Sequence, residues 1–253
     1  MALTREIVSF LDELLDPGGF DDYGPNGLQV PGRAEVGRVA TGVSASLELF
    51  ERAVAADAGL VLVHHGIFWD KAPRALSPAA AARLRVLLAA EINLVAYHLP
   101  LDAHPEVGNN ALLADGLGAT AHEPFAEHGN RAVGVAAHFG EDGVEAGELF
   151  ARVAEVTGRA PLVFDDGPDR VRSLGIVSGS AAGDLETAIA AGLDGFLTGE
   201  PSEPAMTTAR EAGVHFIAAG HYATETFGVR CLGELLAERF GVAHEFIDVL
   251  NPV

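Results

Sequence analysis

An alternation of apolar strands, polar strand ends and helices runs through this 253-residue chain and recurs in its second half. We expect a first helix at residues 4–15 with Thr4 as its N-cap, a strand at 37–43, a helix at 47–56 and a buried strand at 60–63. Because βαβ crossovers produce parallel strands covered by helices, this order predicts an α/β fold with a parallel or mixed sheet.

Two pairs of sequence blocks match in order and in length, which indicates an internal duplication. Residues 42–65 and residues 175–200 both read as a strand with a Ser-containing end, a helix and a second strand with a polar end. Further on, residues 93–102 parallel residues 215–225, since each block is an apolar strand followed by a histidine and, four residues later, an acid.

The duplication predicts two similar α/β lobes whose polar strand ends could face each other across a cleft. We expect residues 1–126 to form the first lobe and residues 127–221 the second, with residues 222–253 packing back on the first. The boundary is placed near residues 124–130, where proline, histidine, glycine and asparagine cluster.

Charge and cysteine content exclude several classes of protein. The formal net charge of -20 works against direct binding of nucleic acid. The single cysteine, Cys231, rules out an internal disulfide and a cysteine-rich zinc site, so any metal must be held by nitrogen and oxygen. The first residues lack the pattern of a signal peptide, and no apolar run is long enough to span a membrane. We therefore expect a cytoplasmic protein.

The strongest chemical signal is a histidine followed four residues later by an acid, found as His98 with Asp102 and as His221 with Glu225. Each pair comes just after an apolar strand, where open α/β sheets bind ligands. His64 and His65 end another strand, and they can serve one site only if the strand has ended by His64, because neighbouring strand residues point to opposite faces. Imidazole and carboxylate without thiolate suit zinc, iron, manganese or nickel, and the donors suffice for two ions.

Each of these residues also has a structural interpretation. His64 and His65 could cap a helix or pack in a turn, and His98 with Asp102 could be a structural hydrogen bond. For Glu200 we favour a solvated acid in an acidic turn. Phe68 and Trp69 are expected in the core, although they could wall a pocket.

Two further features are weaker. The remaining histidines have no second polar partner at a useful spacing, so surface or packing roles are favoured for His104, His122, His128, His138, His215 and His244. The turn at residues 179–184 opens a helix and could receive a phosphate through its amides, but such turns are common.

Five motifs together resemble the family of NGG-one-interacting factor three, whose bacterial members are often labelled GTP cyclohydrolase I type 2 homologues. The motifs are Asn26-Gly27-Leu28-Gln29, His64-His65-Gly66-Ile67-Phe68-Trp69, His98-Leu99-Pro100-Leu101-Asp102-Ala103-His104-Pro105, Thr198-Gly199-Glu200 and Gly220-His221-Tyr222-Ala223-Thr224-Glu225. The resemblance runs in order from about residue 5 to residue 250. It implies two similar α/β lobes, a dinuclear metal site in the cleft between them and a ring-shaped homohexamer.

By this resemblance, His64, His65, Asp102, His221 and Glu225 are the ligands of two divalent metal ions per chain. Asp102 or Glu225 would bridge the two ions. His98 would lie beside them as a catalytic, proton-transferring group.

The resemblance favours a dinuclear metal-dependent hydrolase that acts on a small-molecule substrate, with a purine nucleotide such as GTP as the specific hypothesis. In that hypothesis the ions lower the pKa of a bound water and His98 shuttles the proton. Two alternatives belong to other classes: a metal-binding or metal-delivery protein, and a hexameric regulatory scaffold that acts through protein contacts.

Overall fold

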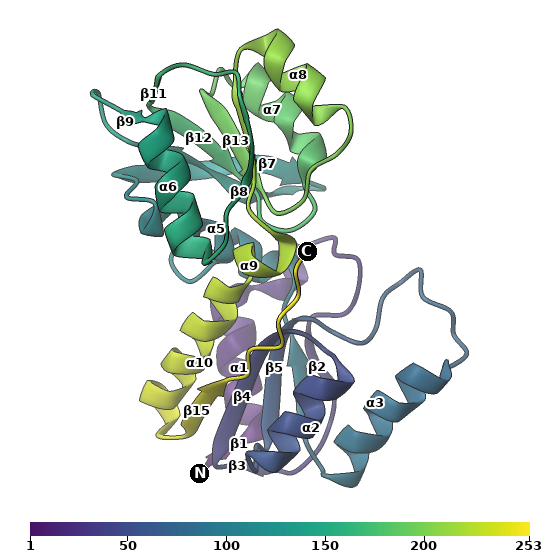
Figure 1. Cartoon of the computed structure of the whole chain (residues 1–253). Helices are drawn as coiled ribbons and strands as arrows, with labels where there is room; N and C mark the ends of the chain where they lie inside the picture. Colours follow the sequence, from purple (N-terminus) through teal and green to yellow (C-terminus); the bar gives the residue numbers. More distant parts are fainter. The chain divides into compact units, whose positions relative to one another are not determined.

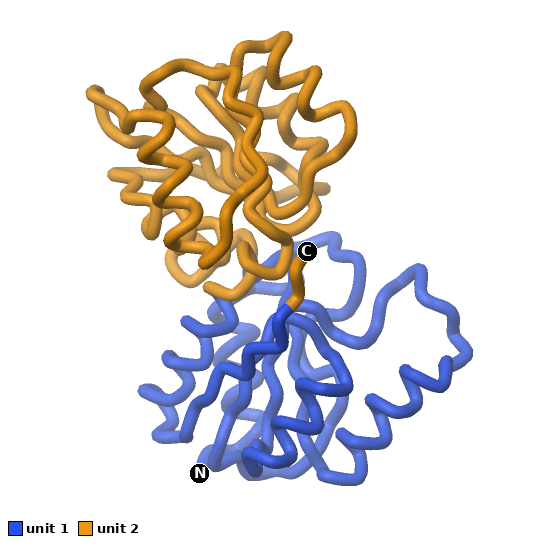
Figure 2. The backbone as a smooth tube through the Cα atoms, in the orientation of Figure 1, with its two compact units in different colours: residues 1–101, 228–250 blue, residues 102–227, 251–253 orange.

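The computed structural model describes residues 1–253, which divide into two compact units (Figure 2). Unit 1 comprises Met1–Leu101 and Gly228–Leu250, and unit 2 comprises Asp102–Phe227 and Asn251–Val253. The chain therefore enters unit 2, returns to unit 1 and ends on unit 2.

The passages between units fall at other residues than the sequence suggested. The chain leaves unit 1 within α4 (Leu99–Ala103) and returns to it within α10 (Thr226–Phe240). Residues 124–130 instead lie in a hairpin of β7 (Ala121–His128) and β8 (Arg131–His138), which pair antiparallel along their length. Because both strands belong to the larger sheet of unit 2, this segment is part of that unit and does not link the two.

Unit 1 contains a five-stranded sheet with helices around it (Figure 1). Its elements besides the two shared helices are β1 (Ala2–Leu3), α1 (Thr4–Leu15), η1 (Pro17–Gly19), β2 (Gly27–Val30), β3 (Glu35–Val36), β4 (Arg38–Ser44), α2 (Leu47–Ala55), β5 (Leu60–His65), α3 (Pro78–Ala89), β6 (Asn93–Ala96) and β15 (Ala243–Phe246). The sheet order is β15-β4-β5-β6-β2, and only β2 runs antiparallel to its neighbour.

The complete burial of the central strand β5 indicates that this sheet is covered on both faces. Its residues from Leu60 to Val63 are all 0% exposed, as expected for a parallel strand between two helical layers. Alternate residues of the strand, Val61 and Val63, pack in one cluster with Leu49 and Phe50 of α2. The helices therefore bury one face of the sheet by the apolar spacing that the sequence predicts.

The first helix begins where the sequence predicts, but its cap differs. Leu3 is the N-cap and makes no side-chain cap bond, while Thr4 is the first helical residue. The Thr4 hydroxyl donates to the carbonyl of Arg33 at 2.7 Å, so the side chain ties the helix to the loop after β2 and does not cap it.

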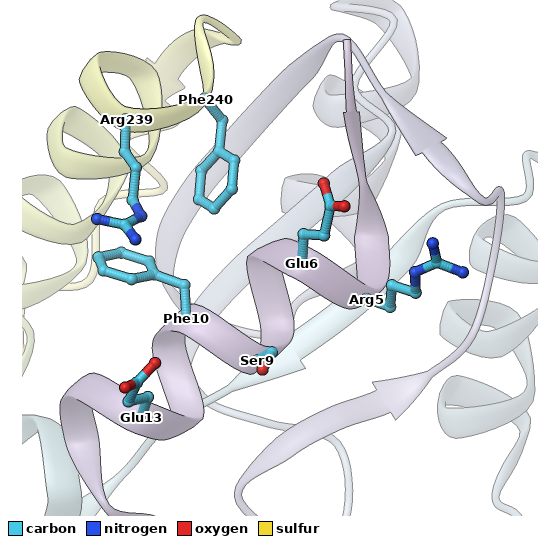
Figure 3. Close-up of a pocket in the computed structure, with 7 residues that line it drawn as sticks. All are labelled: Arg5, Glu6, Ser9, Phe10, Glu13, Arg239 and Phe240. Atoms are coloured by element: carbon cyan, nitrogen blue, oxygen red, sulfur yellow. The ribbon is translucent and has the colours of Figure 1, made fainter.

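Helix α10 returns to unit 1 and packs against α1 (Figure 3). The rings of Phe10 and Phe240 meet edge to face with centroids 5.8 Å apart, and the guanidinium of Arg239 lies 4.4 Å above the Phe10 ring. Aromatic pairs and cation–π contacts of this kind each add a modest attraction to the buried area. The side chains surround a shallow pocket with acids on its rim, Glu6 and Glu13.

Unit 2 contains a six-stranded sheet in the order β10-β14-β13-β12-β8-β7. Its other elements are α5 (Asn109–Gly116), β9 (Val144–Glu145), α6 (Ala146–Thr157), β10 (Leu162–Asp165), β11 (Arg170–Val171), β12 (Ser173–Ile176), η2 (Ala182–Asp184), α7 (Leu185–Ala190), β13 (Gly195–Thr198), α8 (Ala205–Ala212), β14 (His215–Ala218) and α9 (His221–Thr224). Leu113 of α5 and Leu149 of α6 share one apolar cluster with Leu174 and Leu197 of the sheet.

The two units repeat one connectivity. In unit 1, β4, β5 and β6 are parallel neighbours joined through α2 and α3, and in unit 2, β12, β13 and β14 are parallel neighbours joined through α7 and α8. In each, an antiparallel strand, β2 or β10, completes the sheet beside the third strand. The chain is thus an α/β protein whose matching blocks occupy matching places, and their common origin stays a prediction.

Gly233 in the middle of α10 provides a test of packing in unit 1. A Cβ at this position would lie 2.0 Å from Nε2 of His244, whose ring is also fixed by a 2.9 Å hydrogen bond with Oγ1 of Thr41. Helix propensity alone would make Gly233→Ala stabilising by about 1 kcal/mol. We expect the opposite sign, a loss of about 1–3 kcal/mol from overpacking, in urea unfolding followed by circular dichroism.

The control is Gly18→Ala, where a Cβ would have no atom within 4 Å. Adding His244→Ala to Gly233→Ala should recover part of the lost free energy of unfolding. A stabilised Gly233→Ala protein would contradict the packing described for this helix.

Candidate metal centre

Three histidines come together at the carboxyl end of the unit 1 sheet. His64 and His65 end β5, and His98 follows β6. Ring centroids lie 4.6 Å apart for His64 and His65 and 4.9 Å apart for His64 and His98. One ring nitrogen from each histidine lies within 4.8 Å of the other two. The arrangement is therefore a group of nitrogen donors that could hold a metal ion.

The prediction that the strand must end by His64 is wrong, because β5 continues through His65. The two side chains leave the strand toward different neighbours: His64 contacts the carbonyl of Tyr97 beyond β6, and His65 contacts the hydroxyl of Ser44 at the end of β4. At the end of the sheet both imidazoles nevertheless pack ring against ring, at an angle of 50°. At the end of a strand, two consecutive side chains can therefore pack against each other, although within a strand they would point to opposite faces of the sheet.

Fixed acceptors determine which ring nitrogen carries the lone pair. A carbonyl oxygen only accepts, so the 3.1 Å contact from Nδ1 of His64 to the carbonyl of Tyr97 requires a proton on Nδ1. Likewise Nδ1 of His98 donates to Oδ1 of Asp22 at 2.6 Å. In both neutral rings the lone pair is then on Nε2. Hydrogen bonds of this kind orient metal-binding histidines in proteins.

Asp22, which the sequence analysis missed, anchors His98. Besides His98, its carboxylate accepts from Nδ2 of Asn26 at 2.8 Å and from the amide of Leu99 at 3.0 Å. Burial raises the pKa of Asp22, but the hydrogen bond and charge of His98, together with the hydrogen bonds from Asn26 and the amide of Tyr23, outweigh this and leave the pKa lowered. The carboxylate is therefore ionised at neutral pH and accepts the hydrogen bond from Nδ1 of His98.

In unit 2, His221 lies between two carboxylates. Its Nδ1 is in a very short contact with Oε1 of Glu200, and its Nε2 lies 3.2 Å from Oε1 of Glu225. Burial lowers the pKa of His221, but the hydrogen bonds and charges of Glu225 and Glu200 outweigh it and raise the pKa to about 9. The interpretation of Glu200 as a solvated acid is wrong, because Glu200 fixes the His221 ring through Nδ1.

Two glycines permit this approach. A Cβ on Gly179 would lie 2.4 Å from Oε1 of Glu225 and 3.3 Å from Nε2 of His221, and the residue has φ +67°. A Cβ on Gly199 would lie 2.5 Å from the Cα of His221. Larger residues at either position would displace the carboxylate or the histidine, so the local backbone fits a close-packed cluster of donors.

Asp102 lies in the short helix α4 and is 7% exposed. Its Oδ1 accepts from Nδ2 of Asn109 at 2.8 Å and from the hydroxyl of Ser178 at 3.0 Å. Neither partner was expected from the sequence. Because Ser178 and Gly179 are consecutive, one loop contacts both Asp102 and Glu225.

The turn at residues 179–184 uses its amides internally. The amide of Gly179 donates to the hydroxyl of Thr224, and that of Ala181 donates to the hydroxyl of Thr198. The helix that follows, α7, is only six residues long. The turn therefore holds neighbouring loops of unit 2 in place. Its geometry gives no support to the suggested phosphate site.

The fold and these residues together define a class: an α/β protein in which unit 1 carries a group of three imidazoles that could bind metal and unit 2 carries a histidine between two carboxylates. The chain belongs to the Duf34/NIF3 (NGG1p interacting factor 3) family, whose model matches residues 2–252. No helix has the length and apolar character needed to cross a membrane.

Relatives match along nearly the whole chain. A Pseudomonas aeruginosa protein named GTP cyclohydrolase 1 type 2 homolog is 45% identical over 97% of both chains, and a Vibrio cholerae protein of the same name is 42% identical over 98% of both. Among solved structures, protein ybgI, described as of unknown function, is 40% identical with a TM-score of 0.93 and full coverage of both chains. TTHA1606 from Thermus thermophilus is 36% identical with a TM-score of 0.92 and the same coverage.

The raised pKa of His221 gives a prediction for protein stripped of metal. We expect NMR titration of His221 to give a pKa of about 9 in the wild type, and a pKa nearer the ordinary histidine value in Glu200→Gln, which removes one negative charge. Since the folded pKa lies above the unfolded one, the stabilisation is complete below about pH 6.5 and is lost as the pH rises through about 9. Glu203→Gln in the same turn is the control and should leave the titration unchanged.

Proposed function

We propose that the chain is a metal-dependent hydrolase that holds two divalent ions through His64, His65, Asp102, His221 and Glu225. The observation that carries the proposal is the group of three imidazoles in unit 1, whose ring nitrogens lie within 4.8 Å of one another. In His64 the Nδ1 proton is fixed on an acceptor, which leaves Nε2 as the donor to a metal. The carboxylates and His221 of unit 2 supply the oxygen and nitrogen donors that a second ion needs.

The donor set suits zinc, iron, manganese or nickel, since it combines imidazole with carboxylate and has no thiolate. When bound, such ions supply Lewis acidity, which makes water a nucleophile near neutral pH. The fit rests on the donor chemistry and on the glycines at 179 and 199, which leave room for His221 and Glu225 to approach each other.

His98 is proposed as the proton-transfer group. Its backbone amide donates to Oδ1 of Asn26 at 2.8 Å and its Nδ1 donates to Asp22, so the ring has a fixed position. The Nε2 atom can then accept a proton while the ionised Asp22 stabilises the resulting imidazolium. This is the work of a general base whose orientation is set by a buried carboxylate.

The proposed substrate is a purine nucleotide such as GTP. The names of the bacterial relatives support this choice. Three neutral imidazoles and two carboxylates around two divalent ions keep a net positive charge, which would attract an anionic substrate to a chain of net charge -20. We also propose that the chain forms a homohexamer in the cytoplasm. Native mass spectrometry would test this assembly.

Metal content tests the ligand set. We expect close to two ions per chain, by elemental analysis of untagged protein, with a large loss in His65→Ala and in Glu225→Ala because each removes a ligand. The matched controls are His138→Ala and Glu203→Ala, which should retain the wild-type content. Wild-type protein that holds no metal after reconstitution would contradict the proposal.

Activity tests the reaction. Metal-loaded protein should hydrolyse GTP, detected by chromatography of the products, and His98→Gln should lose activity by about 10²–10⁴-fold while retaining its metal, as expected on loss of a general base. If GTP and a panel of amide, ester and phosphate substrates all stay intact, the hydrolase is excluded and metal delivery becomes the better hypothesis. Transfer of the ions to an acceptor protein would then be the measurement.

A further inference from the structure

Three aromatic side chains surround the histidines of unit 1. We call Tyr23, Phe68 and Trp69 the aromatic collar. The ring of Trp69 meets that of His98 edge to face with centroids 5.3 Å apart, and the ring of Tyr23 meets His98 at 6.0 Å. Trp69 also lies 5.9 Å from His65. Tyr23 and Trp69 are therefore in contact with two of the three imidazoles, and Phe68 lines a small cavity together with Trp69, His64 and His98.

The collar is open to solvent, contrary to the expectation that Phe68 and Trp69 are core residues. Tyr23 is 53% exposed and Phe68 is 38% exposed, while Trp69 is partly buried. Exposed aromatic side chains grouped beside polar donors are typical of ligand-binding surfaces. Because apolar ring area is unfavourable in water, this exposed surface favours a partner that covers it.

The loops that carry the collar are fixed to each other before any ligand binds. The amide of Asp70 donates to the carbonyl of Tyr23 at 2.9 Å. A Cβ on Gly24 would lie 2.4 Å from the carbonyl oxygen of Phe68, so the two backbones are in direct contact there. A turn closed by the amide of Ala72 and the carbonyl of Trp69 holds the second loop. The platform is preformed, which lowers the entropic cost of binding.

The space beneath the collar is too small for an organic ligand. The cavity lined by Gly24, Phe68, Trp69, His64 and His98 has a volume of about 10 Å³, far below the range of roughly 300–1,000 Å³ of typical ligand pockets. A ligand must then lie on the outer, exposed surfaces of the rings.

Charge does not select the ligand at this surface. The two loops carry the acids Asp21 and Asp70 and the bases Lys71 and Arg74, all of them exposed. The exposed charges are equal in number for each sign, and the carboxylate of Asp22 is buried against His98, so the aromatic faces are the distinguishing chemistry of the exposed surface. Every heterocyclic base has a π-face that can stack on such a side chain.

We infer that the aromatic collar binds the planar heteroaromatic ring of the ligand, by stacking on Tyr23, Phe68 and Trp69 beside the histidines of unit 1. The inference rests on the proposed function, in which a nucleotide is the substrate, and it assigns the ring of that substrate to a surface outside the metal ligands.

Trp69 is the single tryptophan of the chain, so its fluorescence reports directly on the collar. Metal-loaded protein is titrated with guanosine 5′-monophosphate and adenosine 5′-monophosphate, and in parallel with ribose 5-phosphate, which has the sugar and phosphate without the ring. We expect saturable quenching by both nucleotides and none by ribose 5-phosphate at the same concentrations.

Phe68→Ala and Tyr23→Ala keep the reporter and remove one stacking partner each, so each should raise the apparent Kd at least about fivefold. Arg85→Ala, an exposed change on α3, is the control and should bind as the wild type does. A response to all three ligands alike, a response to none, or unchanged affinity in both alanine variants would overturn the inference.

The metal content of the same samples separates this outcome from failure of the proposed function. Protein that holds no metal contradicts the proposed function itself. Protein that holds its metal and shows no ring-dependent quenching leaves the metal centre in place and rejects the collar as the ring site.

Discussion

The geometry of the donor groups in each unit depends on hydrogen bonds made by Nδ1 of their histidines. His64 donates to the carbonyl of Tyr97, His98 donates to Asp22, and His221 contacts Glu200. An imidazole has two nitrogens that can exchange roles, and a fixed acceptor at one of them removes that freedom. Backbone carbonyls and buried carboxylates thus define the direction of each Nε2 before a metal arrives. The sheet ends, the glycines and the short helices all serve to keep these acceptors in place.

The donors could be predicted from the sequence, whereas their supports could not. His98 and Asp102, like His221 and Glu225, are local patterns that follow an apolar strand, and strand ends are where ligands bind in α/β sheets. Glu200 and Asp22 lie 21 and 76 residues from the histidines they contact, and only the fold brings them together. The end of β5 could not be predicted from the sequence either. Its last residue, His65, pairs with Ser44 of β4, and the residue pattern of β5 itself does not show this pairing.

Buried asparagines connect the core of each unit to its loops. Asn93, 1% exposed, donates to the carbonyl of Gly59 and accepts from the amide of Gly32. Asn110, 0% exposed, accepts from the amide of Ser178 and donates to the carbonyls of Val133 and Asp102. Because an unsatisfied buried amide costs free energy, each asparagine permits only one loop conformation. In unit 2 that conformation is the one that presents Asp102.

The placement of β15 has a consequence for synthesis of the chain. This strand pairs with β4 across about 200 residues of sequence, and the whole of Asp102–Phe227 lies between them. On the ribosome, the body of unit 2 is complete before the outer strand of unit 1 has been made. Until residues 243–246 emerge, β4 presents an unpaired edge that can pair with another chain. The synthesis of unit 1 thus begins first, but its sheet is completed only after the body of unit 2. The chain is most exposed to misassembly while unit 1 still lacks β15.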